Sequence, residues 1–172
     1  MAKDDFYYLE QTPRDLALDL LASLPIEIGD CLLEPFKGEG AFYDQFPEGC
    51  PKDWCELEDG RDFKSGIWSL PHVDWVITNP PFRIDVGDKR VNSFYMSLDY
   101  FSRVARKGLA FFGSDRCIST LTPNRLKELA NRGWYLTGLK VVSVKAWRGR
   151  YYLMVFGRTP NPALGFLEKN YV

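Results

Sequence analysis

The spacing of apolar residues along this chain alternates between the period of a helix and that of a strand. In the first such segment the apolar positions are Leu16, Ala17, Leu20, Leu21 and Leu24. This spacing of three to four residues predicts a helix. Thr12 and Pro13 directly before it form a typical helix start, with Thr12 as the capping residue and Pro13 in the first turn, and Pro25 ends the helix.

The rest of the chain repeats this alternation. Short apolar runs predict strands at residues 31–36, 53–57, 75–78, 109–112, 139–144 and 151–156. A less clear element around 66–70, third in chain order, would bring the number of strands to about seven. Helical spacing predicts helices at residues 40–46 and 94–105, and from Thr122 onward. Alternation of this kind is typical of an α/β fold.

An α/β alternation predicts a mostly parallel sheet with helices on both faces. The last two strands have no helix between them, so the final strand is expected to run antiparallel. In open sheets of this type ligands bind beyond the carboxyl ends of the strands. The residues that follow each strand are therefore the first place to look for chemistry.

Composition narrows the classes of protein that fit. The chain has 172 residues, which is the size of one ordinary domain, and four cysteines, too few for a disulfide-stapled fold. It has no apolar run of about 18 residues and no apolar leader, so we expect neither export nor a membrane span, and a cytoplasmic location. Because His72 is the only histidine, a histidine-rich metal site is excluded, and we predict no metal.

Charge is unevenly distributed along the chain. Residues 1–82 hold 6 Lys and Arg against 17 Asp and Glu, a net charge of −11, and residues 83–172 hold 16 against 6, a net charge of +10. Such a division suggests one face that repels polyanions and another that attracts them. An uneven but purely solvated surface would give the same numbers.

The first predicted strand is followed by an acid and two glycines. Gly38 and Gly40 allow a tight turn and a close approach of the main chain to a ligand. Tyr43 stands where a third glycine would complete a dinucleotide-binding fingerprint, so that fingerprint is incomplete. Glu34 indicates instead a ligand that is cationic or rich in hydrogen-bond donors.

The second strand also ends at an acid. Glu56 lies 22 residues after Glu34, close to the spacing at which a carboxylate reaches the hydroxyl groups of a ribose. Asp62 and Phe63 follow, a pair that suits an adenine by hydrogen bonding and stacking. An exposed charge at the end of a strand is the alternative for Glu56.

The strand at residues 75–78 runs into Asn79-Pro80-Pro81-Phe82. Two prolines in succession stiffen the backbone and stop a strand. The Asn79 amide oxygen and the Pro80 carbonyl together are suited to accept both hydrogens of an NH2 group, and Phe82 offers a flat face for stacking. This arrangement favours catalysis by orientation and electrostatic stabilisation rather than by a strong base.

With these residues in place, the sequence resembles the class I S-adenosylmethionine-dependent amino-methyltransferases, and most closely the DNA N6-adenine methyltransferases. The similar segments are residues 8–21, 34–42, 54–56 with 60–63, and 79–82, in the order of that family. The resemblance implies a Rossmann-like class I methyltransferase domain over residues 1–172. It implies methyl transfer from S-adenosyl-L-methionine to the N6 amine of adenine in DNA.

The resemblance also assigns roles to individual residues. The catalytic residues it implies are Asn79, Pro80, Pro81 and Phe82. The cofactor-binding residues it implies are Tyr8, Thr12, Pro13, Glu34, Pro35, Phe36, Gly38, Gly40, Phe42, Glu56, Asp62, Phe63 and Asn79. Lys37 departs from the small residues often found inside the first glycine-rich motif.

Nucleic acid is the expected partner, with DNA favoured over RNA. Residues 83–92 read as a polar loop next to the catalytic motif, and a second basic segment precedes the last strand. The expected phosphate contacts are Arg83, Lys89, Arg90, Arg148 and Arg150. Because the chain has no room for a separate target-recognition domain, specificity would come from short loops, a homodimer or a separate partner.

Several alternatives share the same motif. Enzymes that methylate RNA adenine, guanine N2 or a protein glutamine amide also present a conjugated NH2 group to such a motif. A catalytically silent subunit that keeps the fold and binds nucleic acid is a further alternative, although it would not need to keep both acceptors of Asn79 and Pro80.

Overall fold

The structure is a computed structural model, and it describes residues 11–66, 68–86, 89–145 and 147–164. The helices are α1 (Arg14–Leu21), α2 (Ser93–Phe101), α3 (Asp115–Ile118) and α4 (Pro123–Asn131), with 3-10 helices η2 (Tyr43–Gln45) and η3 (Phe63–Ser65). The strands are β1 (Leu32–Glu34), β2 (Lys52–Trp54), β3 (Val73–Thr78), β4 (Arg83–Val86), β5 (Lys89–Asn92), β6 (Ala105–Ser114), β7 (Tyr135–Val142) and β8 (Tyr151–Gly157).

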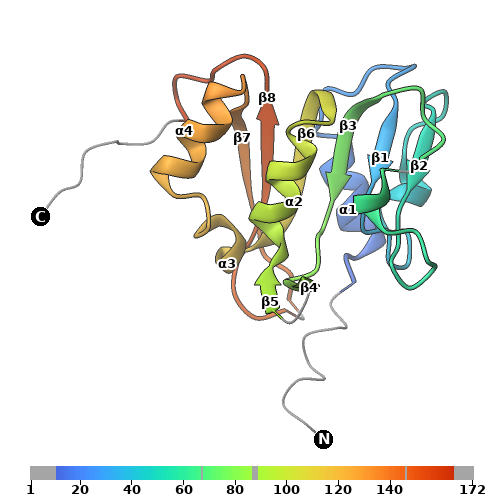
Figure 1. Ribbon diagram of the computed structural model, residues 1–172, viewed down its shortest axis with the longest axis horizontal. Coiled ribbons are helices and arrows are strands. Elements are labelled where there is room, and N and C mark those ends of the chain that lie inside the picture. The colour runs from blue at the N-terminus through green and yellow to red at the C-terminus, as the bar shows by residue number, and fades with distance from the viewer. Residues whose placement is uncertain (1–10, 67, 87–88, 146, 165–172) are drawn as a thin grey trace, which may run out of the picture.

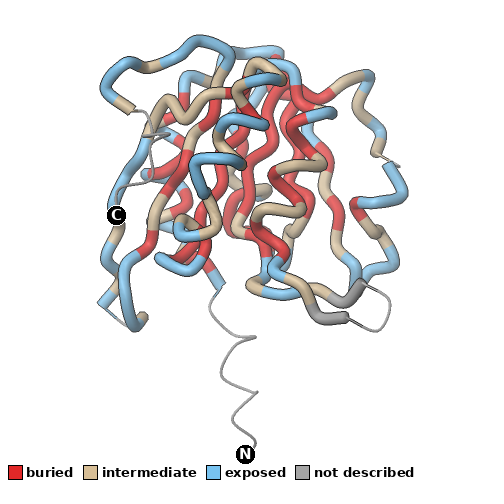
Figure 2. The backbone as a smooth tube through the Cα atoms, turned by 60° about the vertical axis from the view of Figure 1, so that its left-hand side comes forward, coloured by how far each residue is buried: buried red, intermediate tan, exposed pale blue. Residues whose placement is uncertain are grey.

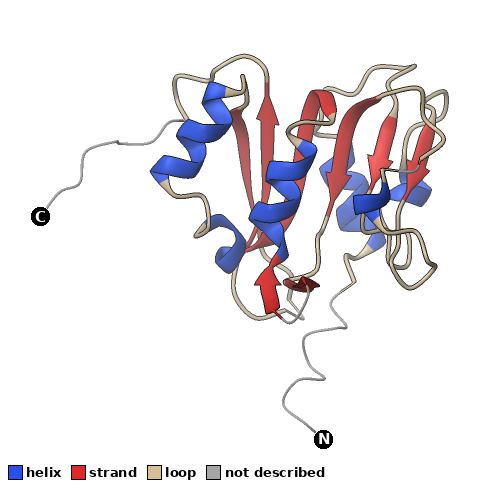
Figure 3. Ribbon diagram, in the orientation of Figure 1, coloured by secondary structure: helices blue, strands red, loops and turns tan. Residues whose placement is uncertain are grey.

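Six strands form one sheet in the order β2-β1-β3-β6-β8-β7 (Figures 1 and 3). Neighbouring strands are parallel from β2 through β1 and β3 to β6. The last strand, β8, runs antiparallel to both of its neighbours, β6 and β7. The predicted α/β fold, with a mostly parallel sheet and an antiparallel last strand, is confirmed.

Both faces of the sheet are buried, as Figure 2 shows for the central strands. Leu32 packs with the residues of α1 on one face, and Leu33 packs with those of α2 and α4 on the other. Both leucines have no exposed surface. Burial of one leucine side chain contributes about 1.5–3 kcal/mol, so strand β1 is well anchored although it is only three residues long. Apolar runs without polar alternation are expected for such strands.

Three expected elements are missing or shorter. The helix predicted for residues 40–46 is only the 3-10 turn η2, because Gly40 has a φ of 80° and Pro47 follows closely. Among the described residues between 66 and 72 there is no strand, so the main sheet has six strands rather than about seven. Ala105 begins β6 instead of extending α2, which ends at Phe101.

Residues 83–92 are not a polar loop. They contain the two strands of an antiparallel hairpin, in which Ile84 lies opposite Val91. Apolar and polar residues alternate here, and this alternation places Ile84 against the main core cluster. The hairpin projects from the sheet edge at which β3 ends (Figure 1).

The boundaries of the remaining elements lie near the expected positions. Helix α4 begins after Thr122, whose hydroxyl accepts a hydrogen bond from the Arg125 backbone, as the start signal predicts. Strand β7 covers Tyr135–Val142, earlier than the predicted 139–144. In the described part of the chain no helix has both the length and the apolar character that a bilayer span requires.

Candidate active site at the carboxyl ends of the strands

One pocket lies at the edge where β1, β2 and β3 end and β8 begins. This placement follows from the parallel order of the sheet, which brings the ends of consecutive strands together. The residues that line the pocket are Gln11, Thr12, Glu34, Phe36, Lys37, Gly38, Ala41, Phe42, Glu56, Asn79, Pro80, Pro81, Phe82, Arg83 and Tyr151.

The turn after β1 forms one wall, and its two glycines are in the left-handed region. Gly38 has a φ of 50° and Gly40 a φ of 80°, so the predicted tight turn is confirmed. A Cβ on Gly38 would lie 2.7 Å from the Gln11 side-chain oxygen. Because that atom is at the movable end of the Gln11 side chain, it is the positive φ rather than this contact that requires glycine at position 38.

Glu34, the last residue of β1, is a buried carboxyl group on the pocket wall. Its exposed fraction is 2%. One of its oxygens, Oε2, accepts a hydrogen bond of 2.7 Å from the Tyr43 backbone. Burial raises the pKa of Glu34 well above 4.5, and this outweighs the opposing effect of the Tyr43 hydrogen bond. A cation in the pocket would favour the ionised form.

Glu56 joins the end of β2 to the glycine turn. Its Oε2 accepts a hydrogen bond of 2.7 Å from the Gly38 backbone. The two acids Glu34 and Glu56 thus line the same pocket, although they come from different strands. Lys37 lines the pocket as well, and its ammonium group lies 4.3 Å from the centre of the Trp54 ring. This cation–π contact holds Lys37 over Trp54.

The Asn79-Pro80-Pro81-Phe82 segment forms the opposite wall. Asn79 Nδ2 donates a hydrogen bond of 3.1 Å to Thr12 Oγ1. The Ser93 hydroxyl donates to the Pro81 carbonyl, and the Ser93 backbone donates to the Phe82 carbonyl at 3.4 Å. The segment is therefore fixed at both ends, by the residue before α1 and by the first residue of α2.

These contacts show which hydrogen-bond acceptors of this segment are already in use and which remain for a ligand. The carbonyls of Pro81 and Phe82 are occupied by Ser93. No donor within the described ranges reaches the Pro80 carbonyl. Since the Asn79 amide nitrogen donates to Thr12, its Oδ1 is the amide atom that remains to accept a hydrogen bond from a ligand.

Thr12 does not cap α1 as predicted. Pro13 is the residue at the cap position, and it makes no side-chain capping bond. Thr12 is 6% exposed, and its hydroxyl accepts from Asn79 instead. The capping interpretation fails because a long-range partner competes for the same hydroxyl.

Most of the residues predicted for the site line the pocket together. They are Thr12, Glu34, Phe36, Gly38, Phe42, Glu56, Asn79, Pro80, Pro81, Phe82 and Arg83. Pro13, Pro35, Gly40, Asp62 and Phe63 do not line it. Tyr8 lies outside the described residues.

Phe63 and Asp62 have other contacts in this structure. The Phe63 ring is 6% exposed and lies 4.9 Å from the Phe36 ring and 5.6 Å from that of Phe101, within the core. Asp62 caps η3 by accepting a hydrogen bond from the Lys64 backbone. Phe36, rather than Phe63, is the aromatic residue that this part of the chain contributes to the pocket.

The pocket also contains residues that sequence reasoning did not select for the cofactor site. Gln11 and Ala41 complete the wall beside the glycine turn. Tyr151 comes from the start of β8, and its ring stacks on Phe112 with 5.8 Å between the centres. The antiparallel direction of β8, which the sequence predicted, brings its first residue to this edge, but the place of β8 in the strand order could not be read from the sequence.

Basic residues from the second half of the chain surround this edge. Arg83, at the start of β4, lines the pocket. Arg148 and Arg150 are exposed in the connection from β7 to β8, which lies at the edge where β3 and β6 end. Lys89 and Arg90 belong to β5, and their side chains are outside the described part of the structure.

The arrangement of strands and helices is that of the class I methyltransferase fold. The chain is 17% identical to PH1948 of Pyrococcus horikoshii, a candidate RNA methyltransferase, with a TM-score of 0.65 over 91% of this chain and 90% of that one. It is 18% identical to TrmN from Thermus thermophilus, with a TM-score of 0.57 over 89% of this chain and 51% of that one.

A third similar structure is the modification subunit of a candidate type I restriction enzyme from Vibrio vulnificus. The identity is 14% and the TM-score 0.58, over 86% of this chain and 44% of that one. This chain thus spans about half of TrmN, less than half of the modification subunit and most of PH1948. No protein-family model matches the sequence, and no curated protein matches it.

Proposed function

We propose that this protein transfers a methyl group from S-adenosyl-L-methionine to the exocyclic N6 amine of adenine in DNA. The observation that carries the proposal is that one pocket is lined both by the carboxyl groups of Glu34 and Glu56 and by the acceptor pair of Asn79 and Pro80. The first pair suits a cationic cofactor with a diol, and the second suits a planar NH2 group.

The residues on the pocket wall fit this cofactor. Glu34 is a buried carboxyl group that would pair with the ammonium group of the methionine moiety, and Glu56 would accept hydrogen bonds from the ribose diol. Gly38 forms the tight turn on the pocket wall, where the lack of a Cβ would let the main chain approach the cofactor closely. When bound, the cofactor supplies a methyl group on a sulfonium, which is an electrophile.

Asn79 and Pro80 would act on the acceptor amine. The Asn79 Oδ1 and the Pro80 carbonyl each accept one hydrogen of the amine, which directs the nitrogen lone pair at the methyl carbon. The cofactor would supply the methyl group to the amine nitrogen, with its own carbon–sulfur bond breaking as the new carbon–nitrogen bond forms, and the amine would lose one proton to solvent. Phe82, which lines the same pocket, would stack on the base.

The positions of the basic residues support a nucleic-acid substrate. Arg83, Arg148 and Arg150 lie at the edge of the sheet where the pocket opens. There they would contact phosphates on either side of a base in the pocket. A paired adenine must first leave the helical stack, which requires a few kcal/mol, so an unpaired adenine is expected to be the better substrate.

RNA is the second candidate substrate, because PH1948 is a candidate RNA methyltransferase with a similar fold. The similar structures also include the modification subunit of a candidate type I restriction enzyme from Vibrio vulnificus, and we favour DNA because the motifs resemble those of the DNA N6-adenine methyltransferases. The mode of binding to the amine by Asn79 and Pro80 would be the same for both substrates. Specificity from a homodimer or from a separate partner is compatible with either.

The proposal is tested by transfer of labelled methyl groups to single-stranded DNA, duplex DNA, RNA and protein, followed by mass spectrometry of the nucleosides. We expect N6-methyladenine in DNA, with Asn79→Ala at least about 100-fold slower, because one oriented acceptor is lost. Asn124→Ala, an exposed asparagine in α4, is the matched control. Equal rates for wild type and Asn79→Ala would refute the assignment, and cofactor binding without any transfer would favour a silent subunit.

A further inference from the structure

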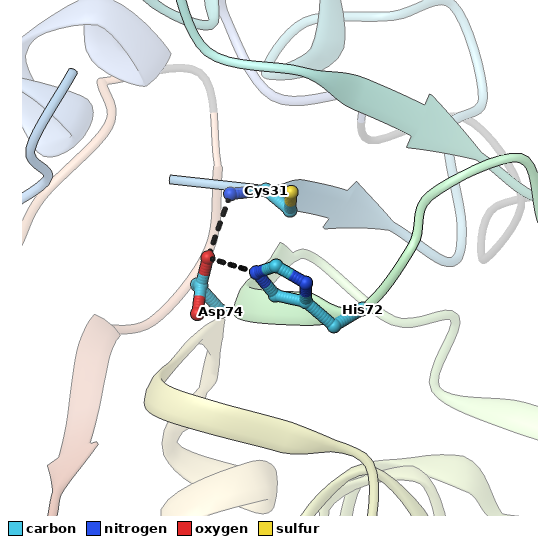
Figure 4. A group of neighbouring side chains, drawn as sticks. All are labelled: Cys31, His72 and Asp74. Carbon is cyan, nitrogen blue, oxygen red and sulfur yellow. Dashed lines mark hydrogen bonds and ion pairs between the residues drawn. The ribbon is translucent and has the colours of Figure 1, made fainter. Parts of the chain in front are cut away.

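A second group of reactive side chains lies at the other edge of the sheet, where β1 and β3 begin. Cys31 directly precedes β1, His72 directly precedes β3, and Asp74 is the second residue of β3. One potential ligand atom from each of these three side chains lies within 4.8 Å of the others (Figure 4). The group is separated from the pocket by the length of the strands.

Backbone contacts hold two members of this group in place. Asp74 Oδ2 accepts a hydrogen bond of 3.0 Å from the Cys31 backbone, and the Asp74 backbone donates one of 2.9 Å to the Cys31 carbonyl. Asp74 Oδ2 also lies 3.1 Å from His72 Nε2 (Figure 4). The three side chains are therefore positioned before any ligand arrives, which lowers the entropy that binding must overcome.

Accessibility differs among the three residues. Cys31 is 3% exposed and Asp74 6%, whereas the His72 side chain is 32% exposed. The group is thus closed on the side of the sheet and open to solvent beside the imidazole. An ion could enter from that side, and water could occupy a remaining coordination position.

The surrounding charges favour a cation. Asp30, the residue before Cys31, and Asp74, which accepts a hydrogen bond from the Cys31 backbone, are both buried acids. Lys107 is already paired with Asp30 at 2.6 Å and with Glu27 at 2.9 Å. The Lys107 ammonium is therefore committed to two other acids and does not neutralise Asp74.

We propose that Cys31, His72 and Asp74 form a binding site for one divalent ion of the zinc class. A thiolate, an imidazole and a carboxylate are the donors that zinc takes in proteins. Tetrahedral coordination with ligand distances of roughly 2.0–2.3 Å needs donor atoms about 3.4–3.8 Å apart, so small side-chain rotations suffice. Binding releases the thiol proton of Cys31 to the buffer and replaces the contact between His72 and Asp74 by bonds to the ion.

Such an ion would have a structural role. It would tie the start of β1 to the start of β3, which are central strands of the sheet. It would leave the pocket unchanged, because Glu34 and Asn79 lie at the opposite ends of the same two strands. The prediction of no metal from the sequence rested on the presence of a single histidine, and this group needs only that one.

The test uses the full chain, freed of metal with a chelator and titrated with Zn2+ in competition with a chromophoric chelator. We expect one Zn2+ per chain, release of a proton, and a rise in Tm of roughly 5–10 °C when free Zn2+ reaches about 100 times Kd. With Co2+ in place of Zn2+, an absorption band from thiolate to cobalt charge transfer should appear.

Two variants remove a ligand and one serves as control. Cys31→Ser should weaken Zn2+ binding more than about 100-fold, since even residues that only support a ligand matter 10- to 100-fold. His72→Gln should do the same, and it keeps a donor for Asp74, so it tests the proposal if Cys31→Ser does not fold. Cys117→Ser changes another buried cysteine and should bind Zn2+ as wild type does. Absence of stoichiometric binding, or binding unaffected by both ligand variants, would overturn the proposal.

Discussion

The Thr12 hydroxyl accepts a hydrogen bond of 3.1 Å from the amide nitrogen of Asn79, 67 residues further along the chain. Thr12 belongs to the segment before α1, and Asn79 is the first residue after β3. The contact fixes which amide atom of Asn79 donates and so leaves Oδ1 to accept. A residue implied for cofactor binding thereby also positions the proposed catalytic amide.

Replacement of Thr12 by valine should lower kcat for methyl transfer by about tenfold or more. Valine keeps the shape of threonine but offers no acceptor, so the Asn79 amide loses its fixed orientation. Thr12→Ser should restore most of the rate because it restores the hydroxyl. The measurement is steady-state kinetics with separate kcat and KM for the nucleic acid.

Thr159→Val, at an exposed threonine, is the control for that experiment. A fall in Tm with unchanged kcat in Thr12→Val would show that Thr12 only supports the fold. An equal loss in Thr12→Ser would also contradict a role for the hydroxyl.

Replacement of Glu34 by glutamine should change how stability depends on pH. Burial raises the pKa of Glu34 well above 4.5, so the folded protein favours the protonated form. Its contribution to stability is complete below the pKa of the unfolded chain and is lost as the pH rises through the raised folded pKa. Relative to wild type, Glu34→Gln should therefore become more stable as the pH increases.

Urea unfolding of both proteins from pH 4 to pH 8 measures this difference. All other titrating groups are shared, so their contributions cancel in the comparison. A difference in the free energy of unfolding that stays constant over this range would contradict the raised pKa of Glu34.

Replacement of Glu56 by alanine should weaken S-adenosyl-L-methionine binding by roughly 10- to 150-fold. A hydrogen bond to a charged group contributes about 1.5–3 kcal/mol, and the glycine turn also loses its bond from Gly38. Calorimetric titration with the cofactor provides the affinity. Glu58→Ala, at an exposed acid two residues further on, should bind as wild type does. Equal affinity in the two variants would disprove the ribose assignment.

Replacement of Arg148 and Arg150 by alanine should weaken nucleic-acid binding and lower its salt dependence. Each phosphate contact with duplex DNA adds about 0.9 to the slope of log K against log salt, and with single strands about 0.7. The double variant should lose up to about two such increments. Fluorescence anisotropy at several salt concentrations gives the slope.

Arg106→Ala is the control for charge, since Arg106 is an exposed residue near the start of β6, at the edge away from the pocket. If this control changes the slope as much per charge as the double variant does, binding is diffuse and not located at the pocket edge.

Several features of the molecule were predictable from the sequence because they depend on local geometry. The part of β3 from Trp75 to Thr78 follows from its uninterrupted β-branched and aromatic residues, and the stop after it follows from Pro80 and Pro81. The turn with positive φ at Gly38 and Gly40 follows from the residue type that tolerates it. The alternation of strands and helices was enough to predict the layers of the fold.

Other features depended on contacts between distant segments. Two predictions from local sequence were wrong. The segment 40–46, predicted as a helix, contains only η2, and the segment 83–92, predicted as a loop, contains the β4–β5 hairpin. Local periodicity reports which backbone shapes a segment favours, and burial against a neighbour decides among them. In the hairpin, Ile84 packs against the core, and this burial favours a strand over a loop.

The sequence by itself therefore determined which residues are the candidates for chemistry at the strand ends, because Glu34, Glu56 and Asn79 each follow an apolar run. Only the tertiary structure decided which residues they contact. Strand order and direction bring Tyr151 to the pocket, Thr12 to Asn79 and Cys31 to Asp74. Such contacts join residues far apart in the chain, and their formation depends on how the whole sheet pairs, which no short segment encodes.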